Sequence, residues 1–91
     1  MRTLLFLSFA ALFIVSCRSP DLIRPGDTLD VAYEKAKNQY DNEKYNEAAQ
    51  AFETVISIGR GTDIGQDAQY YLAESYFKSE RYLVAASEYA R

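Results

Sequence analysis

The chain contains one stretch twice, and this duplication restricts the fold more than any other feature. After a shift of 37 positions, residues 33–54 align with residues 70–91, with six identities over 22 positions. Self-similarity with a period of about 20–50 residues is typical of stacked repeats, whose neighbouring units share one core. We therefore predict a repeat architecture for residues 28–91. The identical pairs are Tyr33/Tyr70, Ala36/Ala73, Glu43/Glu80, Tyr45/Tyr82, Ala48/Ala85 and Ala49/Ala86.

Apolar residues recur every three or four positions within each copy, which predicts a pair of α-helices per copy. The first copy has an apolar stripe through Ala36 and Tyr40, a polar turn at 41–44, and a second stripe through Ala48 and Phe52. The second copy repeats this order, with a turn at 78–80. We expect an all-α fold of two helical hairpins, at residues 28–58 and 63–91.

Polar residues and glycines predict where these helices begin and end. Asp27 is expected to cap the first helix, and Asp63 with Gln66 is expected to form a capping box for the third. Gly59 and Gly61 are expected to end the second helix, because glycine accepts the left-handed conformation that follows many helices.

Small and aromatic residues in the second helix of each copy predict how the hairpins pack. An alanine at a helix crossing lets the partner helix approach closely, and an aromatic ring on the next turn fills the space beside it. The residues expected to hold the hairpins together are Tyr45, Ala48, Phe52, Tyr82, Ala85 and Tyr89.

These hairpins resemble tetratricopeptide repeats, the units of an α-solenoid. Residues 72–89 carry Leu-Ala-x2-Tyr followed by Tyr-x2-Ala-x3-Tyr, close to the signature of that repeat. The sequence departs from the signature at Ala32 and Gln69, where the repeat prefers tryptophan, and the closing proline is absent. Solenoids need about three repeats and a polar end for stability. We therefore expect the second repeat to be incomplete at the C-terminus, in a chain that is the N-terminal part of a longer array.

The amino-terminal stretch has the pattern of an export signal. Residues 4–15 are apolar apart from Ser8 and lead into Ser16 and Cys17. Such a run in a helix spans about 18 Å, well short of the roughly 30 Å hydrocarbon core of a bilayer. The stretch therefore favours a signal peptide at residues 1–16 over a membrane span.

The end of this signal, Ile14-Val15-Ser16-Cys17, resembles a bacterial lipobox. The resemblance implies cleavage between Ser16 and Cys17, with a diacylglycerol on the Cys17 thiol and an acyl chain on its new amino group. These lipids would anchor the protein stably, and no other cofactor is expected. The alternative is an ordinary secretory signal with an incidental cysteine. Arg18, in place of the aspartate that retains lipoproteins in the inner membrane, implies transfer to the outer membrane.

The segment after Cys17 is expected to be a tether. Pro20, Pro25 and Gly26 disfavour regular structure in it. We predict that residues 17–27 form an extended, lipidated linker that holds the hairpins away from the bilayer. The sequence leaves open whether Leu22 and Ile23 dock on the first helix or face solvent.

Composition argues against several classes of function. The chain has 10 basic and 13 acidic side chains and no basic stripe, so we expect no nucleic-acid partner. It has no histidine and a single cysteine, and it lacks a glycine-rich phosphate loop. We therefore expect no catalytic residues, no metal ligands and no enzymatic activity.

A lipobox, a short proline-containing tether and tetratricopeptide-like hairpins together resemble the BamD/YfiO-like lipoproteins of outer-membrane β-barrel assembly. Residues 33–52 and 69–89 carry the resemblance in the folded part. It implies a non-enzymatic, lipid-anchored scaffold that faces the periplasm. The implied partners are a β-barrel assembly protein with periplasmic domains, unfolded outer-membrane protein precursors and the membrane itself.

Tetratricopeptide arrays bind extended peptides on a concave face lined by the first helix of each hairpin. Aromatic residues on that face would serve as anchors for a peptide. The alternative is that these rings pack between the hairpins as part of the core. The residues expected to line the groove are Tyr33, Lys37, Tyr40 and Asp41 in the first copy, and Tyr70, Glu74, Phe77 and Lys78 in the second.

Two other functions fit a lipoprotein built from such repeats. One is glycan binding for nutrient uptake, although no inserted loop with sugar-stacking aromatic residues is visible. The other is the coordination of envelope division or cell-wall growth.

Overall fold

The computed structural model describes residues 21–91, which form four α-helices and no strand. These are α2 (Leu29–Asp41), α3 (Tyr45–Ile58), α4 (Asp63–Lys78) and α5 (Tyr82–Tyr89). The prediction of an all-α fold is confirmed for this part of the chain. No helix within it has the length and apolarity needed to cross a membrane. The predictions for Ser16 and Cys17 lie outside the described residues.

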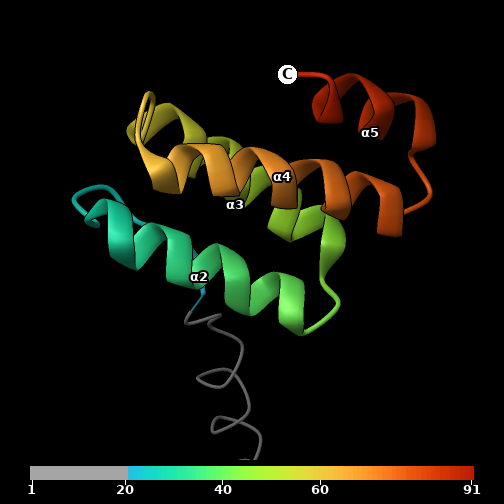
Figure 1. The fold of residues 1–91 in the computed structure, drawn as a ribbon. Coiled ribbons are helices and arrows are strands. Elements are labelled where there is room, and N and C mark those ends of the chain that lie inside the picture. The colour runs from blue at the N-terminus through green and yellow to red at the C-terminus, as the bar shows by residue number, and fades with distance from the viewer. Residues whose placement is uncertain (1–20) are drawn as a thin grey trace, which may run out of the picture.

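Each helix packs against the next one along the chain, and consecutive helices turn back on each other (Figure 1). The helices α2 and α4 also contact each other, so they lie side by side in one layer, with α3 behind them. This arrangement gives α2 and α4 a common outer face.

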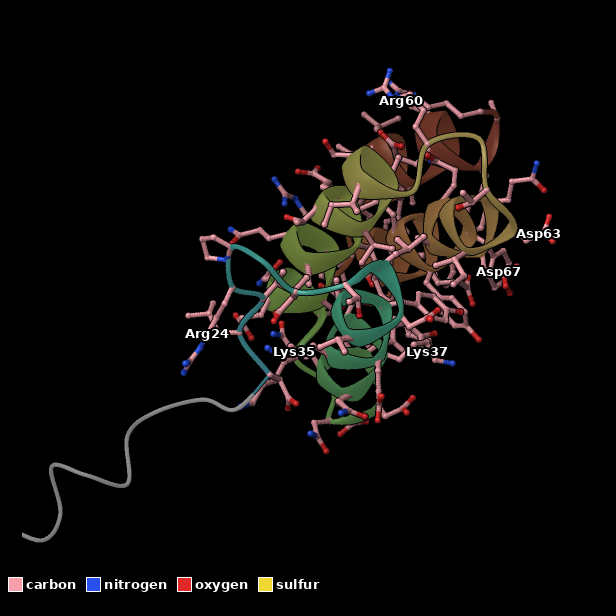
Figure 2. All side chains as sticks on the ribbon, turned by 90° about the vertical axis from the view of Figure 1, so that its left-hand side faces the viewer. Arg24, Lys35, Lys37, Arg60, Asp63 and Asp67 are labelled. Carbon is pink, nitrogen blue, oxygen red and sulfur yellow. The ribbon has the colours of Figure 1, made fainter. Side chains whose placement is uncertain are left out.

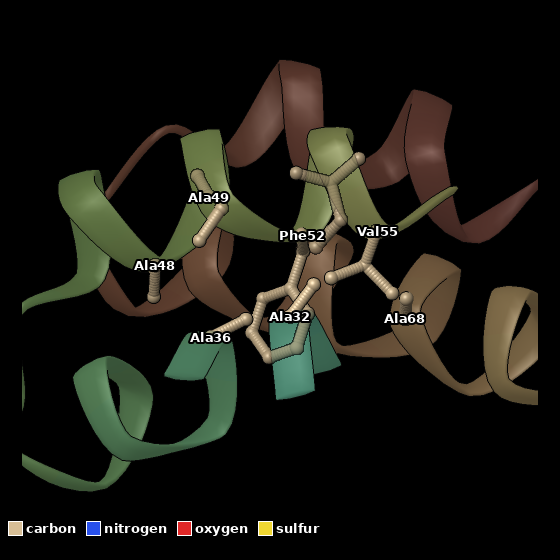
Figure 3. Packing of buried hydrophobic residues seen from close by; sticks show 9 residues of the cluster. Ala32, Ala36, Ala48, Ala49, Phe52, Val55 and Ala68 are labelled. Carbon is tan, nitrogen blue, oxygen red and sulfur yellow. The ribbon is translucent and has the colours of Figure 1, made fainter. Parts of the chain in front are cut away.

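The core is built mostly from alanines around the ring of Phe52, which is fully buried. Figure 3 shows this ring directed from α3 toward α2, near Ala32 and Ala36. Small side chains at these crossings allow the helices to approach closely, and one large ring fills the space between them. The other members of the buried cluster are Ala48, Ala49, Ala51, Val55, Ala68 and Leu72.

The predicted packing residues differ in burial between the two copies. Ala48 and Phe52 are fully buried in α3, and Ala85 is 1% exposed in α5. By contrast, Tyr82 is 55% exposed and Tyr89 is 45% exposed. The first hairpin is therefore covered by α4, whereas one side of α5 is open.

The two predicted N-caps are wrong by one residue. Thr28 caps α2 and Thr62 caps α4, and each hydroxyl accepts the backbone N–H three residues later, at 3.3 and 3.0 Å respectively. Asp63 is the first residue of α4, where its charge still favours the helix N-terminus. Asp27 instead accepts the backbone N–H of Arg24 at 2.8 Å. The sequence did not distinguish the two because aspartate and threonine are both good caps.

The two glycines predicted to end α3 do so in different ways. Gly59 ends the helix with φ −101°, and Gly61 takes the positive value, φ +83°. At Gly59 space is also limited, since a β-carbon there would lie 2.7 Å from Cδ1 of Leu29 and 2.9 Å from Oγ1 of Thr62, and these side chains would have to shift. A β-carbon on Gly65 would in turn overlap the carbonyl oxygen of Gly59. The two glycines allow the α3–α4 loop to close tightly on itself.

The turns inside the two hairpins share one geometry. Glu43 and Glu80, an identical pair in the duplication, have φ values of +62° and +66°. Each donates its N–H to the carbonyl three residues back, at 3.0 Å in both turns. The following N–H reaches the carbonyl five residues back, at 2.9 and 2.8 Å. This pattern closes the C-termini of α2 and α4 as Schellman motifs.

Replacing either glutamate with glycine should stabilise the fold. A left-handed conformation costs a non-glycine residue about 1–2 kcal/mol, partly offset by the larger entropy that glycine loses on folding. Urea denaturation of Glu43→Gly should therefore show a gain of about 0.5–1 kcal/mol. The control Gln50→Gly, within α3, should lose about 1 kcal/mol. A loss of stability in Glu43→Gly would contradict the assigned turn geometry.

The tether prediction expected residues 21–27 to extend away from the helices. Instead, this segment folds back onto α2. The side chain of Lys35 donates to the carbonyl of Leu22 at 3.1 Å, and that of Gln39 donates to the carbonyl of Asp21 at 2.6 Å. Ile23 packs against the core, while the neighbouring Leu22 is 62% exposed. Of the two residues whose position the sequence left open, Ile23 therefore docks on the helices and Leu22 faces solvent.

Candidate functional site

The face shared by α2 and α4 brings together predicted groove residues from both copies of the repeat. Lys37 of α2 reaches across to α4, where its amine lies 3.0 Å from the hydroxyl of Tyr71 and 4.2 Å from the centre of that ring. Figure 2 shows Lys37 and Asp67 on the same side of the molecule. A cation over an aromatic face contributes roughly 0.5–1 kcal/mol at an exposed site.

Tyr71 is the centre of an aromatic cluster on this face. Its ring stacks on Phe52 at 5.5 Å with an interplanar angle of 15°. It meets Tyr40 edge to face at 5.3 Å and Tyr70 at 5.4 Å. Tyr40 also contacts Tyr45 at 5.5 Å, so the cluster joins α2, α3 and α4. Each such pair contributes about 0.5–1.5 kcal/mol beyond the area it buries.

The sequence prediction missed Tyr71. In the duplication Tyr71 aligns with Glu34, so the repeat gave no signal at this position. A signal was nevertheless present in the helical spacing. Tyr71 follows Ala68 by three positions and precedes Ser75 by four, and both of these residues are fully buried. The helical period therefore places Tyr71 beside the buried side of α4, at the edge between the core and the α2–α4 face.

The charges on this face are fixed in the forms that predominate at neutral pH. The hydrogen bond to Tyr71 raises the pKa of Lys37, so its amine stays protonated. Burial raises the pKa of Tyr40 to about 12, with a further contribution from the Glu74 carboxylate. Burial likewise raises the pKa of Tyr33. Tyr33 and Tyr40 therefore present neutral hydroxyl groups, and Lys37 presents an ammonium group.

The predicted aromatic groove residues fall into two groups. Tyr33 and Tyr40 of α2 are half-buried and pack against the core, as the alternative reading expected. Tyr70 and Phe77 of α4 are 53% and 51% exposed. Of these four residues, only the α4 pair leaves about half of its surface open to a ligand.

The polar predicted residues lie among these rings. Glu74 of α4 accepts a hydrogen bond from the hydroxyl of Tyr89, whose ring also contacts Tyr70 at 6.2 Å. The amine of Lys78 lies 5.8 Å from the ring centre of Tyr45. Asp41 is exposed at the end of α2. The face thus combines fixed hydrogen-bonding groups with two open rings.

A separate groove of about 380 Å³ lies between residues 22–23 and α3. Gln39 lines it, and the side-chain carbonyl oxygen of Gln39 has no hydrogen-bond partner. That oxygen is fully shielded from solvent, so a ligand in the groove would not reach it without a rearrangement. We therefore place the candidate site on the α2–α4 face.

Comparison with family models, with curated proteins and with solved structures gave no match.

Proposed function

We propose that this protein is a non-enzymatic, lipid-anchored scaffold of the machinery that assembles β-barrel proteins in the bacterial outer membrane. Its hairpins would be of the tetratricopeptide type that builds α-solenoids, and it would be a lipoprotein of the BamD/YfiO-like kind. The observation that carries the proposal is the α2–α4 face, where Tyr70 and Phe77 are open and flank Glu74.

The chemistry of this face suits an extended peptide with aromatic side chains. Exposed aromatic rings on a rigid helix supply contact area at a low entropic cost, and such rings dominate the binding energy of many interfaces. The amine of Lys37 and the carboxylate of Glu74 would fix the polar groups of the peptide. β-Barrel precursors end in an aromatic-rich strand, which provides matching chemistry.

The proposal places the protein at the periplasmic side of the outer membrane, anchored through lipids on Cys17. Its protein partner would be a β-barrel assembly protein with periplasmic domains. A pull-down in mild detergent, with the lipidated chain as bait, should recover such a protein. Recovery of only cell-wall enzymes would favour a role in envelope coordination instead, and binding to glycans would favour nutrient uptake.

The α4 rings provide a direct test of peptide binding. A Tyr70→Ala/Phe77→Ala variant should bind a peptide copied from the C-terminal strand of a β-barrel protein at least about 10-fold more weakly. Its helix content should be unchanged, since both rings are about half exposed. Binding is measured by fluorescence anisotropy and helicity by circular dichroism.

Leu83→Ala is the matched control, because Leu83 lies on α5 and is 90% exposed. It should leave both affinity and helicity unchanged. Equal affinity of the double variant and the control, with helicity retained, would rule out this face as the peptide site.

A further inference from the structure

Residues 21–27 form an ordered clamp on α2. The amine of Lys35 bridges the carbonyl of Leu22 and the carboxylate of Asp27, at 3.1 and 2.7 Å. The amide of Gln39 holds the carbonyl of Asp21 at 2.6 Å. Because Lys35 and Gln39 lie one turn apart on α2, the two contacts hold successive parts of the segment along the same helix face.

The segment is also closed upon itself. The carboxylate of Asp27 accepts the backbone N–H of Arg24 at 2.8 Å, and the N–H of Asp27 returns to the carbonyl of Arg24 at 3.1 Å. These hydrogen bonds, the Arg24 contact first and the Lys35 contact next, lower the pKa of the Asp27 carboxyl. Ile23 adds apolar contact with the core. Order in this segment therefore rests on both polar and apolar contacts.

The clamp changes how far a lipid on Cys17 lies from the helices. A free linker from Cys17 to Thr28 would span up to about 40 Å at roughly 3.6 Å per residue. With the chain fixed from Asp21 onward, only four steps remain, or at most about 14 Å. That reach is close to the diameter of one helix with its side chains, about 10–12 Å.

We propose that residues 21–27 and the adjoining side of α2 rest on the headgroup surface of the bilayer. The hairpins then have one fixed orientation, with α2 nearest the lipid and α5 farthest from it. Figure 1 shows the clamp entering beside α2, on the opposite side of the molecule from α5. This inference rests on the lipid anchor of the proposed function.

The exposed residues of the clamp have chemistry that suits this surface. Leu22 is 62% exposed and is followed two positions later by Arg24, which is also exposed. An apolar side chain near a cation fits the boundary between acyl chains and headgroups, where Leu22 can enter the acyl region and Arg24 can meet a headgroup phosphate. The chain thus offers lipid contacts in addition to the covalent anchor.

The test uses the lipidated full chain in phospholipid vesicles that contain a headgroup-attached quencher. A fluorophore is placed on a cysteine introduced at Asn42, one turn beyond Asn38 on α2, or at Leu83 on α5. Cys17 is the only native cysteine, so acylation leaves each introduced thiol unique. Quenching of the fluorophore should be strong at position 42, close to the headgroups, and weak at position 83, far from them.

A Lys35→Met/Gln39→Met variant removes the clamp donors while keeping side-chain bulk. In this variant, the fluorophores at positions 42 and 83 should be quenched to the same extent. The control Lys44→Met/Gln50→Met changes two exposed residues of the same types and should keep the difference. Circular dichroism confirms that each variant keeps its helices.

Equal quenching at the two positions in acylated protein would overturn the inference, as would a difference that survives in the clamp variant. Mass spectrometry of the peptide containing Cys17 shows whether the protein is acylated, and so distinguishes a failure of this inference from a failure of the proposed lipid anchor. An unacylated Cys17 would overturn the lipid anchor itself, and the proposed membrane contact with it.

Discussion

Replacing Tyr71 with alanine should lower the free energy of unfolding by about 2–4 kcal/mol, because a large, half-buried ring is removed from the junction of three helices. The ring stacks on Phe52, meets Tyr40 edge to face and lies under the amine of Lys37. A small domain is stabilised by only about 5–10 kcal/mol in total, so the loss would be visible as a large fall in the thermal midpoint.

Two further variants separate the contributions within this cluster. Tyr71→Phe keeps the ring but removes the hydroxyl that accepts the Lys37 hydrogen bond, and should lose about 0.5–1.5 kcal/mol. Tyr82→Ala removes a ring that is 55% exposed and contacts Phe77, and should lose less than Tyr71→Ala. Equal losses in the Tyr71→Ala and Tyr82→Ala variants, measured by urea denaturation, would contradict the central place of Tyr71.

Replacing Gly65 with alanine should destabilise the protein by about 1–3 kcal/mol, although alanine is the better helix former. The added methyl group would overlap the carbonyl oxygen of Gly59. That oxygen is held in place by the hydroxyl and the backbone N–H of Thr62, at 2.5 and 3.0 Å. Relief of the clash therefore requires the α3–α4 loop to open.

The neighbouring variant Gln66→Ala provides the control for Gly65→Ala, since Gln66 is exposed in the same turn of α4. It should leave the thermal midpoint nearly unchanged. An increase in stability of Gly65→Ala, of the size expected from helix propensity alone, would show that the loop accommodates the methyl group.

The helices were predictable from this sequence because the apolar pattern that indicates them occurs in both copies of the repeat. Apolar stripes at helical spacing occur in both copies, and Gly59 and Gly61 mark the boundary between the hairpins. Burial of Ala48 and Phe52 followed from the same stripe. By contrast, the exact caps were not predictable, because Asp27 and Thr28 are both suitable and only the folded chain shows that Asp27 is engaged by Lys35.

The candidate site was only partly predictable, for a physical reason. A repeat alignment finds what two copies share, whereas the centre of the α2–α4 face is a residue that they do not share. Tyr71 of the second hairpin packs against Phe52 and Tyr40 of the first, whereas within residues 21–91 no hairpin precedes α2 for Glu34 to contact in the same way. Likewise, the proline content predicted an extended linker, but the side chains of Lys35 and Gln39 hold residues 21–22 against α2.

The small buried area of α5 has a consequence for the dynamics of the fold. This helix has eight residues, and Ala85 is its only buried side chain. A helix of this length is not stable alone, so it depends on contacts with α4 such as the Tyr89–Glu74 hydrogen bond. In a chain made of residues 21–91, α5 should therefore detach and re-form far more often than the other three helices unfold. In these brief openings the outer side of α4, with Tyr70 and Phe77, becomes more accessible than in the closed form.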